Sequence, residues 1–170
     1  MNLNRYQKIC VTLGLACFLF LPLRGYAADK SVVGTWQLLS WVSEDAESGK
    51  ISNVFGERPN GYLIYTAGGR MSVNLSADGR KPLSGDRFST PAEERAQAFS
   101  TAIAYSGTYD LTTDGIMHHV EVATFQNWVG TEQFRYVVVQ GETMNVKTPP
   151  IKGPPDGKTK VMTLVFKRLE

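Results

Sequence analysis

The sequence predicts a mainly β protein: a small antiparallel β-barrel of about eight strands with one short helix. Three observations support this prediction. Beyond the N-terminal segment, the chain is a succession of short runs rich in β-branched and aromatic residues. Short turns containing Gly, Asp or Pro separate these runs, and such sequential hairpins favour an up-and-down barrel or a sandwich. A single segment has apolar residues at the spacing of three and four that indicates an amphipathic helix.

The N-terminal segment has the pattern of a signal peptide. Two basic residues, Arg5 and Lys8, precede an apolar run of about 15 residues, and the small residues Gly25 and Ala27 fit the positions that a signal peptidase recognises. The run is shorter than the roughly 20 residues that span a bilayer as a helix. We therefore expect residues 1–27 to be cleaved and the protein to be exported, periplasmic or secreted, with no stable membrane span after processing.

Residues 28–170 are then expected to form a single domain. Both cysteines lie in the predicted signal peptide, so the mature domain can form neither a disulfide nor a thiolate metal site. Processing also removes three of the 18 basic residues, which leaves 15 against 16 acidic residues, and no nucleic-acid partner is expected. The sequence has no nucleophile elbow, phosphate loop, dinucleotide fingerprint or His-x-x-x-His pair, so we expect no cofactor and no metal.

In chain order, the first predicted strand is residues 33–42, and it ends at the polar stretch 43–50. Residues 61–66 and 70–76 form the next two strands. Between them lies Ala67-Gly68-Gly69, whose glycines allow the positive φ of a tight turn. These two strands should therefore pair as a hairpin.

The helix is predicted at residues 90–104. Thr90 as the N-cap, Pro91 at the first helical position and Glu93 three residues after the cap form a capping box. One face of this segment carries the apolar side chains of Ala92, Ala96, Phe99 and Ile103. We expect this amphipathic helix to lie against the barrel or to cover one of its ends.

The remaining strands follow from the same pattern and are predicted at residues 105–112, 116–125, 131–139, 142–148 and 161–169. Turns that contain glycine, at residues 113–115 and 140–141, join the strands on either side of them. The proline-rich segment 149–160 is expected to be an exposed loop, because proline removes the amide donor that a sheet requires.

Gly34-Thr35-Trp36, on the first predicted strand, resembles the Gly-x-Trp motif that opens lipocalins and their relatives. Residues 61–72, 104–111, 118–135 and 147–150 follow in an order and spacing similar to those of the bacterial and fungal lipocalin-like domain family. The resemblance covers essentially the whole mature chain. It implies a lipocalin-like antiparallel barrel with an internal pocket, but little about chemistry, because a fold does not by itself give a function.

The resemblance also implies structural roles for Gly34, Trp36 and Arg168. In lipocalins the tryptophan of the motif packs at the closed end of the barrel beneath an arginine from the last strand, and Trp36 and Arg168 match these positions. A guanidinium stacked on an indole contributes about 0.5–2 kcal/mol to stability. We therefore expect Trp36 to belong to the core.

The two histidines of the chain, His118 and His119, are adjacent on a predicted strand, so they point to opposite faces and cannot line one pocket or bind one metal. The apolar residues at positions 116, 120 and 122 favour His118 as the inward residue. His119 and Glu121 share the other face, roughly 7 Å apart along the strand. They are either a histidine held by a carboxylate at the surface, or an acid/base or ligand-binding pair. The candidates for catalysis are His118, His119 and Glu121.

Further candidates for ligand binding come from the barrel rim and interior. Trp128 lies on a predicted rim loop, where it either covers the pocket or anchors the loop. Gln133 and Arg135 share a strand face with two valines, and if those valines are core, both polar side chains point into the barrel. An inward arginine requires an acceptor, either Glu121 or the carboxylate of a ligand.

Tyrosines supply apolar rings with one hydroxyl, a surface that suits both a core and a small-molecule pocket, at Tyr62, Tyr65, Tyr105 and Tyr109. The complete set of candidates for ligand binding is Tyr65, Tyr109, His118, His119, Glu121, Trp128, Gln133 and Arg135.

These residues favour an exported protein that binds a small, largely apolar molecule, with one polar or anionic end, inside the barrel. One alternative is an isomerase, cyclase or hydrolase that acts on a small hydrophobic substrate by acid/base chemistry. Another is a protein-interaction module of the cell envelope. A retained ligand that is released unchanged would distinguish binding from catalysis.

Overall fold

The computed structural model describes residues 32–153 and 156–170, so the predicted signal peptide, residues 1–27, lies outside the described residues. The strands are β1 Gly34–Asp45, β2 Ile51–Asn53, β3 Asn60–Tyr65, β4 Arg70–Ser76, β5 Ala102–Leu111, β6 Ile116–Ala123, β7 Glu132–Gln140, β8 Thr143–Lys147, β9 Ile151–Lys152 and β10 Thr159–Arg168. The helices are α1 Ala92–Ser100 and the 3-10 turn η1 Gln126–Trp128. Within this part of the chain, no helix is long and apolar enough to cross a membrane.

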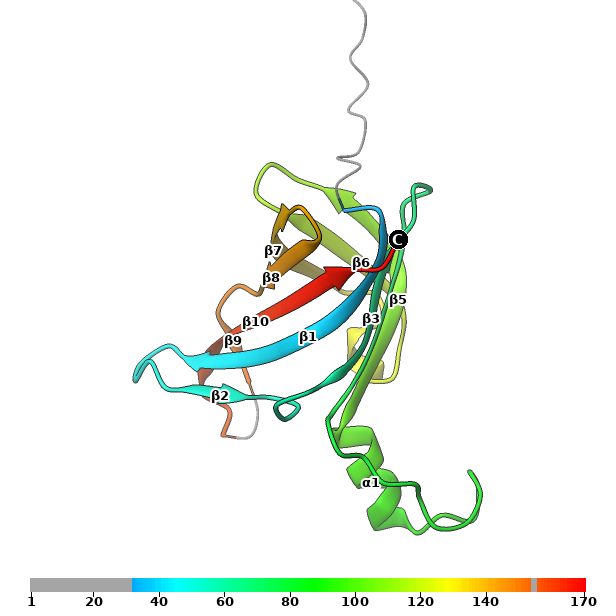
Figure 1. The fold of residues 1–170 in the computed structure, drawn as a ribbon. Helices are drawn as coiled ribbons and strands as arrows, with labels where there is room; N and C mark the ends of the chain where they lie inside the picture. The colour runs from blue at the N-terminus through cyan, green and yellow to red at the C-terminus, as the bar shows by residue number, and fades with distance from the viewer. Residues whose placement is uncertain (1–31, 154–155) are drawn as a thin grey trace, which may run out of the picture.

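Eight of the strands close into an antiparallel barrel, as the sequence predicts (Figure 1). Strands β1, β3, β4, β5, β6, β7, β8 and β10 each pair with the next, and β10 then pairs with β1. The short strands β2 and β9 extend the sheet beside the ends of β1 and β10. Closure leaves no long open edge in the barrel, and the alternation of side chains divides each strand between the interior and the outer surface.

The predicted hairpin of residues 61–66 and 70–76 is confirmed as β3 and β4, with Gly69 at a φ of 78° in the turn. Two other boundaries differ from the prediction. Strand β1 continues to Asp45, through the stretch predicted as polar loop, because it pairs there with both β2 and β10. The segment 149–160 is not wholly an exposed loop, since it contains β9 and the start of β10, where Lys160 is buried.

Helix α1 is shorter than predicted, and the predicted capping box is wrong. The hydroxyl of Thr90 donates hydrogen bonds to the carbonyl oxygens of Ser84 (3.0 Å) and Asp86 (2.6 Å), so it does not cap the helix. Pro91 is the N-cap and makes no side-chain capping bond. No residue of α1 is buried, and the helix projects from one end of the barrel (Figure 1). The last predicted helical positions instead belong to β5.

The narrow end of the barrel is built around Trp36, which is fully buried. Its indole nitrogen donates to the carbonyl of Val32 (2.8 Å), and the guanidinium carbon of Arg168 lies 4.0 Å from the ring centroid. The predicted contact between Trp36 and Arg168 is therefore confirmed. Gly34 has a φ of 139°, and a Cβ there would lie 2.2 Å from the carbonyl oxygen of Glu170, so only glycine fits where the start of β1 meets the C-terminal residue.

A β-bulge interrupts the alternation on β6. Between Ser106 and Gly107 of β5, the partner on β6 changes from Val122 to Val120, which leaves Glu121 without a partner on β5. Side chains beyond the bulge therefore change face. Val122, predicted to share the apolar face of His118, is 65% exposed.

Candidate ligand-binding pocket

A cavity of about 960 Å³ occupies the barrel interior on the side away from Trp36. This volume lies at the upper end of the range for sites that bind small molecules. Most of the wall is apolar and comes from strands around the barrel, with Trp41, Leu63, Val73, Leu75, Val146 and Leu164 among its residues. Trp41 packs edge-on against Phe55, with ring centroids 4.6 Å apart. The cavity therefore offers a large surface for an apolar molecule.

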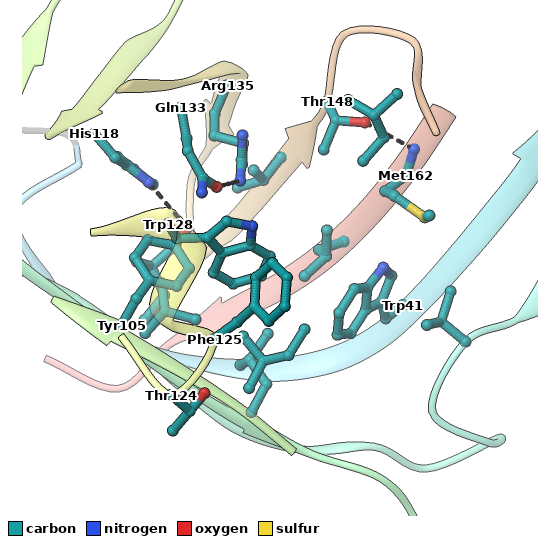
Figure 2. Close-up of a pocket in the computed structure, with 18 of the residues that line it drawn as sticks. Trp41, Tyr105, His118, Thr124, Phe125, Trp128, Gln133, Arg135, Thr148 and Met162 are labelled. Carbon is teal, nitrogen blue, oxygen red and sulfur yellow. Dashed lines mark hydrogen bonds between the residues drawn. The ribbon is translucent and has the colours of Figure 1, made fainter. Parts of the chain in front are cut away.

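Polar side chains gather at one side of this cavity, where β5, β6 and β7 lie next to one another. Figure 2 shows His118, Gln133 and Arg135 on that side and Trp41 on the other. Strand register explains the grouping, because His118 pairs with Gln133 and Ile116 pairs with Arg135 across β6 and β7. Tyr105, on β5, completes the group.

His118 is held between two tyrosines. The Tyr65 hydroxyl lies 2.6 Å from its Nε2 atom, and the Tyr105 hydroxyl lies 3.0 Å from its Nδ1 atom. Burial, together with the positive charge of Arg135 and the neighbouring His119, lowers the pKa of His118 to about 3. Burial also raises the pKa of both tyrosine hydroxyls, and the nearby Arg135 guanidinium partly opposes this rise. At neutral pH the group is a neutral imidazole between two protonated phenols.

Arg135 brings a positive charge to the cavity wall without a matching carboxylate. Its guanidinium donates to the side-chain oxygen of Gln133 (2.6 Å) and to the carbonyl of Phe134 (2.8 Å). Within residues 32–153 and 156–170, no carboxylate lies within salt-bridge distance of it. Of the two acceptors considered for Arg135, Glu121 is not its partner, because Glu121 pairs with Arg70 on the outer surface. The charge of Arg135 is thus available to a molecule in the cavity.

His119 and Glu121 lie outside the cavity. The Nε2 atom of His119 is 2.8 Å from Asp110 Oδ2, and its Nδ1 atom is 3.3 Å from Glu132 Oε1. His119 and Glu121 therefore bond to different partners on the outer surface and do not form the predicted acid/base pair. Of the three catalytic candidates, His118 alone lines the cavity.

The remaining candidates divide between the cavity and its support. Trp128, in η1, lines the cavity and packs edge-on against Tyr105, with ring centroids 5.7 Å apart. Tyr65 is buried behind His118, and the Tyr109 hydroxyl donates to the carbonyl of Thr66 (2.9 Å), so neither lines the cavity. Binding by the residues that do line it stays a prediction.

Sequence reasoning did not include Tyr105 among the ligand-binding residues, although it belongs to the polar group. Tyr105, Gly107 and Tyr109 are every second residue of β5, and all three are buried on its inner face. This period of two was the pattern in the sequence that could have identified Tyr105 as an inward residue. In the described residues, no group of three or more His, Cys, Asp or Glu side chains is arranged to hold a metal ion.

Two comparisons with known proteins show what the chain is similar to. A family model described as a lipocalin-like domain matches residues 33–169. The chain is also 31% identical over 87 residues to the 4'-hydroxy-3'-methoxypropiophenone carrier protein of Aspergillus oryzae. That match covers 46% of this chain and 78% of the carrier protein.

Proposed function

The chain belongs to the lipocalin-like domain family, and from this premise we propose that it binds and carries a small, largely apolar molecule inside the barrel. The observation that carries the proposal is the cavity of about 960 Å³, which is walled mainly by apolar side chains and has one polar side. Such a site buries the apolar body of a ligand and uses a few polar groups to orient it.

The polar side chains lie on one side of the cavity, and this arrangement favours one orientation of a ligand that has a single polar end. Gln133, Arg135 and Tyr105 present polar atoms there, while Trp41 and Leu164 belong to the apolar wall. A ligand with one polar end gains hydrogen bonds from Arg135 when that end faces it. The reverse orientation leaves without an acceptor those N–H groups of the guanidinium that do not bond Gln133 or Phe134. We therefore propose that the polar end of the ligand lies against Arg135.

The similar protein from Aspergillus oryzae supports carriage as the class of function. Its name identifies it as a carrier of an aromatic ketone, a molecule with an apolar ring and a few oxygen atoms. A ligand of this kind suits the aromatic and aliphatic wall of the present cavity. The same ketone is therefore a useful first probe of this cavity.

The proposal is tested by native mass spectrometry of protein purified from its own host, followed by extraction of the bound compound. We expect a retained apolar compound that is released unchanged. In a thermal-shift screen of lipids, terpenoids and aromatic acids, a ligand should raise the midpoint of unfolding, and Arg135→Met should reduce that rise for polar ligands. Arg70→Met, which removes an arginine from the outer surface, is the matched control.

Two results would argue against the proposal. The first is a protein that retains no compound and is stabilised by none in the screen. The second is a compound found only in altered form after incubation, with the alteration lost in His118→Ala. That result would favour the enzymatic alternative, in which His118 is the acid/base residue that faces the cavity.

We further propose that the protein is exported after removal of residues 1–27. The support is the basic segment, apolar run and small residues of the N-terminus. Protein isolated from the host should have the mass of residues 28–170. A full-length precursor that remains in the cytoplasm would contradict export, but it would leave the proposed binding untouched.

A further inference from the structure

On the polar side of the cavity, the hydrogen bonds between the side chains determine which groups remain free to donate or to accept. The free groups in turn limit the chemical class of the ligand's head group. We infer that the side chains there present donors alone, so that the ligand's head group is an oxyanion without a proton to donate, namely a carboxylate. The inference rests on the proposed function and adds to it the chemical class of the ligand. It is built from two hydrogen-bonded pairs, His118 with Tyr105 and Gln133 with Arg135, and from the charge of Arg135.

The tautomer of His118 follows from its hydrogen bond with Tyr65. A neutral imidazole has one N–H donor and one acceptor nitrogen. The Tyr65 hydroxyl is buried, and its hydrogen-bond partner is the Nε2 atom of His118. If Nε2 carried the proton, the hydroxyl proton of Tyr65 would be buried without an acceptor, which is the unfavourable arrangement. Tyr65 therefore donates to Nε2, and the imidazole proton lies on Nδ1.

The position of that proton determines the role of the Tyr105 hydroxyl. The Nδ1–H group of His118 donates to the Tyr105 oxygen, 3.0 Å away. The Tyr105 hydroxyl proton then needs an acceptor of its own. The polar group beside it is the Arg135 guanidinium, which has donors alone. Tyr105 lines the cavity, so its proton is available to the ligand.

The side chain of Gln133 also lines the cavity. Its amide oxygen accepts a hydrogen bond from Arg135 at 2.6 Å, as Figure 2 shows. The opposite orientation of the amide would place an NH2 group against the guanidinium, donor against donor. The amide oxygen is therefore engaged, and the NH2 group remains to donate.

The charge at this site selects an anion. Arg135 uses donors to bond Gln133 and Phe134, and a guanidinium has further N–H groups in the same plane. Glu132, next to Gln133 in the sequence, also borders the cavity. Its carboxylate oxygen, however, lies 3.3 Å from the Nδ1 atom of His119, and the alternation along β7 puts the side chain on the face opposite Gln133 and Arg135. A carboxylate matches both the charge and the planar geometry of the guanidinium. An amide or an alcohol would bring a proton for which Tyr105, Gln133 and Arg135 offer no free acceptor.

The inference is tested with matched ligands that differ only in the head group. Isothermal titration of the mature protein would compare a straight-chain fatty acid with the primary amide, the alcohol and the hydrocarbon of the same chain. The acid should bind at least about tenfold more tightly than the amide or the alcohol, as expected for a charge-assisted hydrogen bond. Tyr105→Phe should weaken acid binding by about tenfold. Tyr109→Phe is the matched control, because its hydroxyl bonds the carbonyl of Thr66 outside the cavity.

The outcomes separate this inference from the proposed function. Binding of the amide or the alcohol as tightly as the acid would overturn the inference and leave binding of apolar molecules in place. If none of the four compounds binds, and the screen described above also finds no ligand, both proposals fail. Equal loss of acid binding in Tyr105→Phe and Tyr109→Phe would also overturn the inference, since it would indicate a general effect on the barrel.

A second measurement addresses His118 directly, as a residue that positions the Tyr105 hydroxyl. The nitrogen chemical shifts of an imidazole distinguish the two neutral tautomers, and the chain has only two histidines, so His119→Gln assigns the spectrum. At neutral pH we expect His118 to carry its proton on Nδ1. A proton on Nε2 would overturn the inference whether or not any ligand binds.

Discussion

Trp36 illustrates how a single side chain stabilises the narrow end of the barrel. It is fully buried, its nitrogen bonds the carbonyl of Val32, and its ring lies beneath the guanidinium of Arg168. These contacts join the beginning of β1 to the end of β10, which pair along their lengths. Trp36 therefore contributes to core packing, to hydrogen bonding and to the closure of the barrel.

Trp36→Ala should destabilise the protein by about 3–5 kcal/mol, the usual effect of removing a large buried aromatic side chain. The measurement is the free energy of unfolding from denaturant titration. Trp128→Ala, at the half-buried rim, is the control and should have a smaller effect. A variant at position 36 that unfolds like the wild type would show that the Gly-x-Trp motif does not anchor this barrel.

His118 makes stability depend on pH. Its pKa of about 3 lies below the ordinary value of 6.5, so between these values the unfolded chain binds a proton that the native protein does not. The free energy of unfolding should therefore fall as the pH drops from 6.5 toward 3, by about 1.4 kcal/mol per pH unit.

The comparison is the pH dependence of unfolding for wild type and His118→Gln, whose amide offers both a donor and an acceptor. His119 and the carboxylates are common to both proteins, so the difference between the two profiles isolates His118. The variant should have the flatter profile. Parallel profiles for the two proteins would mean that His118 is not buried in its neutral form.

At the scale of elements, the strands and the helix differ in how firmly they are held. Strand β1 pairs with β3 and β10, and its inner side chains belong to the core. Helix α1 buries no residue, and Phe99 is 53% exposed. The tertiary contacts of the helix are few, and a helix of nine residues has little stability of its own. We therefore expect α1 to open more easily than β1 and β10.

Amide hydrogen exchange should be much faster in α1 than in β1 and β10, because local opening of the helix does not require the barrel to unfold. Exchange followed by mass spectrometry measures this difference. Ala96→Pro should abolish what protection α1 has and leave the protection of β1 unchanged. Protection of α1 equal to that of β1 would show that the helix unfolds only with the barrel.

At the scale of the whole molecule, the barrel depends on a pairing between the two ends of the described chain. Strand β10 lies between β1 and β8 and pairs with both. The amide of Leu169 donates to the carbonyl of Thr35 (2.8 Å), which ties the end of the chain to its first strand. Without β10 the sheet would have two long open edges, and the cavity would lose the wall formed by Met162, Leu164 and Phe166.

Deletion of residues 159–170 should abolish cooperative unfolding and the near-ultraviolet circular dichroism of the buried aromatic residues. The control is replacement of Ile151 and Lys152 by serine, because β9 pairs with only two residues of β10. This control should stay folded. A truncated chain that still unfolds in one sharp transition would show that closure by β10 is dispensable.

Local sequence pattern was enough to predict the positions of most strands and the hairpin of β3 and β4, and it favoured an inward face for several side chains without settling which face of residues 116–125 lines the pocket. His118, Gln133 and Arg135 line the cavity, as the alternation along β6 and β7 predicts. Alternation is a local property, because neighbouring residues on a strand must point to opposite faces. The motif around Trp36 also indicated the contact with Arg168, but through resemblance and not through any local pattern.

Contacts between side chains on distant strands could not be predicted from local pattern. Tyr65 and His118 are 53 positions apart in the sequence, and their hydrogen bond follows from the order and register of the intervening strands. Glu121 pairs with Arg70 for the same reason, and the bulge at Glu121 turns Val122 outward against its local pattern. Local periodicity specifies a face, but a contact across the barrel depends on register and closure, which belong to the whole sheet.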